Sequence, residues 1–295
     1  MHKVLSNKWV IFSLVLPGFL LFLFAIFLPI FLSGYFGMTD WSGVGKPVFV
    51  GLKNFQKLLF DDPIFYHSLF NALKLGLGLI LIQHPLSMLF AILLDKISGK
   101  AEKFYRAAFF VPNVISVVVT SAMWVSMFNP DYGLINAVLK AVGLGFLRNE
   151  WLGDEKTALG ALIFICAWQG FGWAMLLYYA GLKGIPEELY EAAKLDGASW
   201  FNVYTRITFP LMTPVIRINI TLAMIAALKT METVFLTTGG GPGDRTQFLA
   251  NYLYVKAFQS FEYGYGNAIS VVFVIVCLLV TYLLNKYIKT DVGEY

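Results

Sequence analysis

Long apolar runs, each free or nearly free of charge, alternate with shorter polar stretches along this chain of 295 residues. An α-helix rises about 1.5 Å per residue, so about 20 apolar residues cross the roughly 30 Å of hydrocarbon in a bilayer. Each run of that length predicts a membrane-spanning helix. The runs lie at residues 9–32, between Lys74 and Asp95, between Arg106 and Asp131, between Lys156 and Lys183, at about 211–236, and from Glu262 to Lys286.

The run at residues 211–236 is the least uniform, because it contains three charged residues. Arg217 lies toward one end, where its long side chain can reach the headgroups. Lys229 and Glu232 are three positions apart, a spacing that places two side chains on one helix face. We expect these two residues to pair near the other end of the span. There they either set the depth of the helix or lie near a translocation path.

Composition supports the membrane interpretation. Hydrophobic residues make up 58% of the chain, charged residues 14%, and the mean hydropathy is +0.69. Soluble domains are about 45–50% apolar and about 25% charged. Cys166 and Cys277 both lie in apolar runs, a pattern that indicates neither a disulfide framework nor a metal site. The predicted fold class is all-α, a polytopic bundle of about six membrane helices that forms a single transmembrane domain over residues 1–295.

Basic residues indicate how the predicted spans are oriented, because cytoplasmic connections carry an excess of Lys and Arg. The net charge is +4, but the basic residues fall between the apolar runs, so they indicate topology and no nucleic-acid partner. Connections on one side are the richer in Lys and Arg, and residues 95–106 form the most basic short loop. The chain termini, with Lys3 and Lys289, belong to that side and are expected in the cytoplasm.

The stretch between the fourth and fifth predicted spans, residues 183–206, has the local signals of two short helices joined by a turn. Pro186 suits the start of a helix, and the two glutamates that follow it favour the positive end of the helix dipole. Gly197 can adopt the left-handed conformation that ends a helix, and Ser199 can cap the next one.

The first of these short helices carries a narrow apolar stripe formed by Leu189, Ala192 and Ala193. The alanines permit close approach by another surface. Such a stripe is consistent with docking into a partner protein and equally with packing against the chain's own bundle.

The same stretch resembles the EAA motif of ABC-importer permeases, through Glu191-Ala192-Ala193, Asp196-Gly197 and Ile207-x-x-Pro210. Other segments resemble the sugar branch of that family, the maltose-type permeases, and together they extend over nearly the whole chain. They are residues 50–55 (VGLKNF), 109–112 (FFVP), 128–136 (FNPDYGLIN), 168–172 (WQGFG) and 236–242 (LTTGGGP). One departure is Phe209, where the family more often has leucine before the proline.

The resemblance implies a type I ABC-importer permease in a bacterial or archaeal cytoplasmic membrane. It also implies the partners: a second permease subunit, cytoplasmic ATPase subunits and an extracytoplasmic solute-binding protein, with a sugar or oligosaccharide as substrate. In such importers the EAA helix docks into a cleft of the ATPase. The resemblance therefore assigns ATPase coupling to Glu191, Ala192, Ala193, Asp196 and Gly197.

The chain is expected to be a transport subunit and not an enzyme. It lacks the G-x-x-x-x-G-K-[ST] loop that cradles the phosphates of ATP, and the glycine-rich residues 239–246 (GGGPGDRT) contain no lysine. The pattern shows no nucleophile–base arrangement, metal-ligand spacing or cofactor motif. Energy must come from another subunit or from an ion gradient.

Candidate residues for a translocation path follow from the chemistry of sugars, which present apolar ring faces and hydroxyl edges. Trp168, Gln169 and Trp173 in the fourth span, with Asn113 in the third, supply aromatic surfaces and amide groups. Tryptophan is also common at membrane boundaries, so aromatic packing is the alternative interpretation.

Two other transport functions are compatible with part of this pattern. One is an ABC permease for another solute, such as a phosphorylated polyol. The other is an ion-coupled secondary transporter, which usually has paired charges near the midplane and internal repeats. His84 beside Pro85 could serve a proton relay, but a structural role near the carbonyl that proline frees is favoured.

Overall fold

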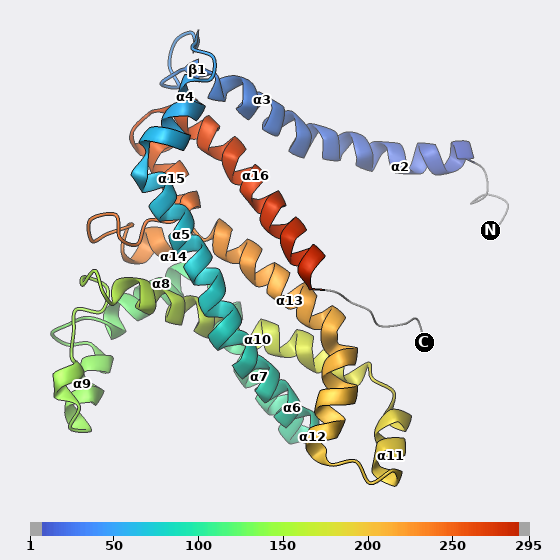
Figure 1. The fold of residues 1–295 in the computed structure, drawn as a ribbon. Helices are drawn as coiled ribbons and strands as arrows, with labels where there is room; N and C mark the ends of the chain where they lie inside the picture. Colours follow the sequence, from blue (N-terminus) through green and yellow to red (C-terminus); the bar gives the residue numbers. More distant parts are fainter. Residues whose placement is uncertain (1–7, 289–295) are drawn as a thin grey trace. The chain divides into compact units, whose positions relative to one another are not determined.

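The computed structural model describes residues 8–288 and is almost entirely helical (Figure 1). Segments written η are π-helical, apart from the 3₁₀ turn η4. In chain order the elements are α2 (Lys8–Phe22), η1 (Leu23–Phe27), α3 (Leu28–Gly37), β1 (Thr39–Asp40), β2 (Val48–Phe49), α4 (Lys53–Gln56), η2 (Lys57–Asp61), α5 (Pro63–Gly78), η3 (Leu79–Gln83), α6 (His84–Asp95), α7 (Lys100–Val114), α8 (Val117–Met127), α9 (Leu134–Ala141), η4 (Gly145–Leu147), α10 (Ala158–Lys183), α11 (Glu187–Leu195), α12 (Trp200–Val203), η5 (Tyr204–Thr208), α13 (Phe209–Lys229), α14 (Glu232–Thr237), α15 (Leu249–Tyr254), η6 (Val255–Gln259) and α16 (Tyr263–Tyr287).

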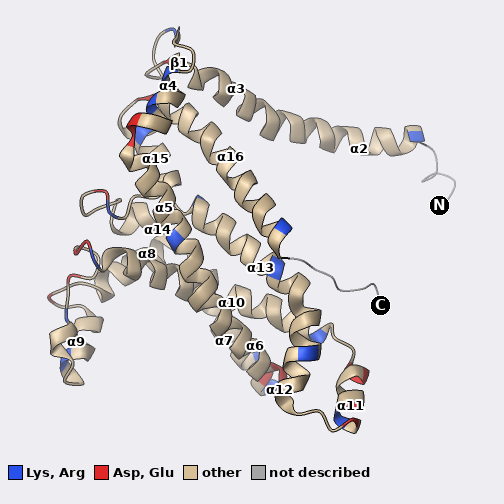
Figure 2. Ribbon diagram, in the orientation of Figure 1, with Lys and Arg blue, Asp and Glu red and all other residues tan. Residues whose placement is uncertain are grey.

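Within residues 8–288, five helical stretches are long and apolar enough to cross a membrane, and a bent helix pair brings the number to six. The charged residues gather toward helix ends and connections, so the long helices are mostly uncharged (Figure 2). The predicted all-α bundle with about six spans is confirmed. The five stretches are Lys8–Gly37, Pro63–Asp95, Ala158–Lys183, Trp200–Lys229 and Tyr263–Tyr287.

The prediction of one continuous helix between Arg106 and Asp131 is wrong. Helices α7 and α8 meet at an angle of 91°, because Ile115 and Ser116 leave the helical conformation with ψ of 133° and 139°. Pro112 lies in the last turn of α7 and cannot donate a backbone hydrogen bond there. The run is apolar on both sides of the bend, and hydropathy does not indicate whether an apolar helix is straight or bent.

The predicted pairing of Lys229 with Glu232 is also wrong. Helix α13 ends at Lys229, and Thr230 then takes an extended conformation with ψ of 116° before α14 begins at Glu232. The two side chains therefore do not share one helix face. Both are exposed, and no ion pair joins them in the described part of the chain.

The chain divides into two compact units, of which the larger comprises Pro63–Tyr252 and Cys277–Tyr295. In this unit α10 packs against α5, α6, α7 and α13. Aliphatic and aromatic side chains fill the space between these helices, and one buried cluster comprises Met88, Ala91, Leu94, Met175, Tyr178, Tyr179, Leu182 and Met212.

The smaller unit comprises Met1–Asp62 and Leu253–Val276. Its short strands β1 and β2 pair in antiparallel register, with Thr39 opposite Phe49. Helices α3 and α16 approach closely here, since a Cβ added to Gly37 would lie 3.1 Å from the backbone nitrogen of Ala268. Helix α2 has no buried residue, so its apolar surface is available to lipid.

Two glycines of α10 set its distance from neighbouring helices. A Cβ added to Gly172 would lie 2.1 Å from the carbonyl oxygen of Phe109 in α7. A Cβ added to Gly170 would lie 3.1 Å from Nε2 of Gln83 in η3. Small residues allow membrane helices to pack this closely, where dispersion contacts stabilise the bundle.

We expect Gly172→Ala to destabilise the protein by about 1–3 kcal/mol, the usual cost of overpacking, because backbone must move to admit the methyl group. Gly160→Ala is the matched control, since Gly160 lies in the same helix with no neighbouring atom within 4 Å of an added Cβ. Thermal unfolding in detergent should show a lower midpoint for Gly172→Ala only. Equal midpoints for both variants would contradict this account of the α7–α10 contact.

Candidate functional site

Helix α11 ends in the turn that the sequence predicted. Gly197 has a φ of +72°, the left-handed conformation. The Ala198 N–H donates to the Ala193 carbonyl at 2.9 Å, and the Gly197 N–H donates to the Lys194 carbonyl at 3.1 Å. This pair of bonds is a Schellman motif, which satisfies the last carbonyl groups of the helix. The chain therefore reverses sharply after Asp196.

Two hydrogen bonds and one buried side chain fix this loop on the helix that follows. Ser199 caps that helix as predicted, with its Oγ accepting from the Asn202 N–H at 3.4 Å. The Tyr190 hydroxyl and Thr208 Oγ1 share a hydrogen bond of 3.2 Å. Ala193 is buried, with 8% of its surface exposed. Helix α11 is therefore anchored to η5, the segment between α12 and α13 (Figure 1).

The remaining surface of the loop is exposed. Glu191, Ala192 and Asp196 are all solvent-accessible, and the Leu195 and Trp200 side chains are 90% and 64% exposed. Packing against the chain's own bundle thus accounts for a single buried residue of α11. The other side chains of α11 and the exposed Leu195 and Trp200 therefore remain accessible to a partner.

A cavity of about 450 Å³ lies within the larger unit, between η3, α7, α10 and α13. No Asp, Glu, Lys or Arg is among the described residues that line it. Gln169 and Trp173 reach it together because they are four positions apart on α10 and share a face. The polar and aromatic lining residues are Gln83, His84, Asn113, Cys166, Gln169, Trp173, Asn219 and Thr230.

The break between α7 and α8 is tied to this cavity. Gln169 Nε2 donates to the carbonyl oxygen of Ile115 at 3.2 Å, which satisfies a group that the break leaves outside a helix. Unpaired backbone groups are costly in hydrocarbon, so this bond stabilises the bend. Asn113 lies just before the bend and lines the same cavity.

His84 is held by a side chain and not by a backbone carbonyl. Its Nδ1 lies 2.9 Å from the Tyr178 hydroxyl, and the two rings meet edge to face. Both side chains are buried, with 5% and 2% of their surfaces exposed. His84 thus connects the wall of the cavity to the core cluster around α10.

Trp168 lies elsewhere, although it is adjacent to Gln169 in sequence. It lines a separate apolar pocket of about 480 Å³ with side chains of η3, α6 and α7, and it packs edge to face on Trp124 at 5.4 Å. Five helical positions correspond to a rotation of about 140°, so Trp168 and Trp173 cannot face one cavity. The structure brings Asn113, Gln169 and Trp173 together and leaves Trp168 apart.

Lys229 and Glu232, the remaining candidates, do not line the 450 Å³ cavity. Sequence reasoning missed Gln83 and Asn219, which both line this cavity. Each is a polar residue inside a predicted span, and polar side chains in spans usually face a bundle interior or a cavity. That signal could have identified both.

A helical membrane bundle with an uncharged polar cavity and an exposed helix–turn at one end defines a permease, a subunit that conducts a solute across a membrane. The chain belongs to the family described as binding-protein-dependent transport system inner membrane component, whose model matches residues 85–293. The predicted membership among ABC-importer permeases is therefore confirmed, and the protein is an inner membrane component of such a system.

Relatives extend the match to nearly the full chain. The probable ABC transporter permease protein YurN of Bacillus subtilis (strain 168) is 35% identical over 98% of this chain and 99% of its own. The multiple sugar-binding transport system permease protein MsmF of Streptococcus mutans serotype c (strain ATCC 700610 / UA159) is 36% identical over 98% of each chain.

The fold also has a solved counterpart. A chain in the crystal structure of a bacterial alginate ABC transporter in complex with an alginate pentasaccharide-bound periplasmic protein matches with a TM-score of 0.82. The match covers 100% of this chain and 99% of that one, at 23% sequence identity. This likeness confirms the architecture of an ABC-importer permease.

We expect Trp173→Ala to lower solute uptake by the assembled importer about tenfold, because stacking on an aromatic ring is worth about 1–3 kcal/mol. Trp168→Ala should instead lower the thermal midpoint and leave the half-saturating solute concentration unchanged, since its ring packs in the apolar pocket. Uptake kinetics and unfolding measured on the same preparations separate the two effects. Normal kinetics in Trp173→Ala would exclude this ring from solute contact.

Proposed function

We propose that this chain is the permease subunit of an ATP-driven importer for sugars or oligosaccharides, and that it forms half of the translocation path. The observation that carries the proposal is the chemistry of the 450 Å³ cavity. Its wall offers the amides of Asn113, Gln169 and Asn219, the Trp173 ring and no acidic or strongly basic side chain. Such a wall suits an uncharged solute with many hydroxyl groups.

The same chemistry argues against the alternatives. A phosphorylated polyol would call for Arg or Lys, which form charge-assisted bonds to phosphate. An ion-coupled transporter would place charged pairs near the midplane. Lys229 and Glu232 were the candidates for such a pair, and they lie outside the cavity on two different helices. The sugar-binding system to which the streptococcal relative belongs supports the same substrate class.

The proposal assigns residues 183–206 as the coupling loop of a single transmembrane domain that extends over residues 1–295. Glu191, Ala192, Asp196 and Gly197 would present the docking surface to a cytoplasmic ATPase, with Ala193 holding α11 on the bundle. The chain has no phosphate-binding loop of its own, so separate ATPase subunits would supply the energy. A second permease and an extracytoplasmic solute-binding protein would complete the importer.

The coupling role requires the loop to be cytoplasmic, and with it both chain termini, which lie outside the described residues. The basic connection at residues 95–106 supports this orientation. A reporter fused after Lys194 should read as cytoplasmic and one fused after Arg148 as external. An external Lys194 would contradict both the orientation and the coupling role.

The test of the proposed function is co-purification with candidate ATPase, permease and solute-binding partners, followed by reconstitution in proteoliposomes. Addition of the correct sugar should raise ATP hydrolysis and produce uptake, while this chain alone should hydrolyse no ATP above background. Stimulation by a phosphorylated solute but by no neutral sugar would contradict the substrate class. Sustained hydrolysis by the purified chain alone would contradict the permease role.

We expect Gly197→Val to abolish coupling, with at least a tenfold loss of transport per ATP hydrolysed and normal membrane abundance. A left-handed conformation costs a residue with a side chain about 1–2 kcal/mol, so the turn would open and misdirect α11. Glu191→Lys should act on the same contact by reversing the charge of an exposed docking residue.

Gly143→Val is the matched control for this prediction. Gly143 also has a positive φ, +81°, and no neighbouring atom within 4 Å of an added Cβ, but it lies outside the coupling loop. It should show the same backbone penalty with coupling intact. Wild-type transport by Gly197→Val with its ATPase bound would exclude the loop from coupling.

A further inference from the structure

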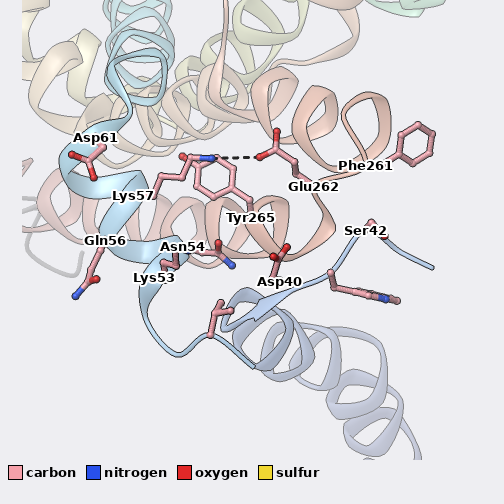
Figure 3. A pocket seen from close by; sticks show the side chains of 12 residues that line it. Asp40, Ser42, Lys53, Asn54, Gln56, Lys57, Asp61, Phe261, Glu262 and Tyr265 are labelled. Carbon is pink, nitrogen blue, oxygen red and sulfur yellow. Dashed lines mark ion pairs between the residues drawn. The ribbon is translucent and has the colours of Figure 1, made fainter. Parts of the chain in front are cut away.

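A second cavity, of about 600 Å³, lies within the smaller unit (Figure 3). Its wall joins the ends of two membrane-spanning helices. Asp40 follows the last residue of α3 by three positions, and Tyr265 lies in the first turn of α16. Because both helices change from apolar span to polar connection at this point, the cavity lies at the depth of the lipid headgroups.

A cluster of aromatic rings beside the cavity indicates the same depth. Trp41 stacks on Phe36 with ring centroids 4.8 Å apart, and its ring centroid lies 5.7 Å from that of Tyr263. Tyr35 meets Phe36 edge to face at 5.4 Å. Tryptophan and tyrosine gather at membrane–water interfaces, where their rings reach the headgroups.

The cavity offers two cationic groups. Lys57 extends across it, with Nζ 3.6 Å from a Glu262 carboxylate oxygen and 4.4 Å from the centre of the Tyr265 ring (Figure 3). Glu262 has a second cation, Lys256, at 3.1 Å. Lys57 can therefore turn to an anion without leaving that carboxylate unpaired. Lys53 lies one helical turn away and is exposed.

Beside the paired Glu262, the same cavity offers two unpaired carboxylates, Asp40 and Asp61. Both are exposed, and neither forms an ion pair within the described part of the chain. The adjacent Asp62 differs, since it is buried and accepts a hydrogen bond from the Tyr265 hydroxyl. The wall thus carries two lysines and three carboxylates, of which only Glu262 is paired with a lysine, so groups of both charges can serve a ligand.

We propose that this cavity binds the headgroup of a phospholipid that carries a phosphate and a primary ammonium. Lys53 and Lys57 donate hydrogen bonds to the phosphate, and Asp40 accepts one from the ammonium. The acyl chains continue along the exposed apolar surface of the adjoining spans, whose side chains lipid must cover. This site is independent of the solute that the permease carries.

The test uses the full chain in nanodiscs of equal parts phosphatidylethanolamine, phosphatidylcholine and phosphatidylglycerol, with retained lipid counted by native mass spectrometry. Phosphatidylethanolamine should be enriched over both others, because phosphatidylcholine cannot donate from its ammonium and phosphatidylglycerol has none. Lys53→Gln and Asp40→Asn should each lower its retention about tenfold, as for the loss of one charge-assisted hydrogen bond. Equal retention of the three lipids would overturn the proposal.

Lys46→Gln is the matched control, since Lys46 is an exposed lysine of the same connection that does not line the cavity. It should retain phosphatidylethanolamine as the wild type does, and an equal loss in this variant would overturn the proposal. Soluble glycerophosphoethanolamine tests the source of the headgroup, and displacement of the lipid at equal concentration would point to a soluble ligand instead. Loss of solute-binding protein affinity in Lys53→Gln with lipid retention unchanged would reassign the cavity to protein docking.

Discussion

The close contact of α10 with η3 and α7 is the interaction on which the larger unit depends. In hydrocarbon, apolar surface alone gives helices no reason to associate, so association depends on dispersion contacts and hydrogen bonds. Gly172 lets the α7 backbone approach where any larger residue would hold it away, and Gly170 leaves room for the Gln83 side chain. Gln83 then lines both the polar cavity and the apolar pocket that contains Trp168. Gln83 is thus a shared wall residue of the two spaces.

The polar lining of the cavity is also part of what holds the bundle together. The break after α7 leaves the Ile115 carbonyl outside a helix, and the Gln169 amide satisfies it. His84 similarly forms a hydrogen bond between its Nδ1 and the Tyr178 hydroxyl in the core. A side chain held in this way has a fixed position, and fixed polar groups recognise a solute at a lower entropic cost than mobile ones. In the proposed function, the structural and the solute-binding roles of these residues would thus coincide.

The sequence was most informative where the relevant physics is local. The length of each apolar run located the spans, and glycine and serine chemistry located the turn at Gly197 and the cap at Ser199, because those bonds join residues close in the chain.

The bend after Val114 was missed, since apolar composition does not indicate whether a helix is straight or bent. Lys229 and Glu232 were paired on the assumption of an unbroken helix. Counting rotation along α10 would have separated Trp168 from Trp173. The convergence of Gln83 and Asn219 on one cavity depends on packing between distant segments, which spacing within a helix cannot reveal.

A continuous helical stretch links the proposed coupling loop to the proposed path. Residues 200–229 form 30 residues of helix, about 45 Å at 1.5 Å per residue, with Thr208 near one end and Thr230 just beyond the other. Thr208 is bonded to Tyr190 of α11, while Asn219 and Thr230 line the cavity. In the proposed function, a displacement of α11 by a docked ATPase would pass through the Tyr190–Thr208 bond to this helical stretch and along it to the cavity. A docking loop held only by flexible chain would transmit no such displacement, so the proposed coupling would depend on the Tyr190–Thr208 bond and the buried Ala193.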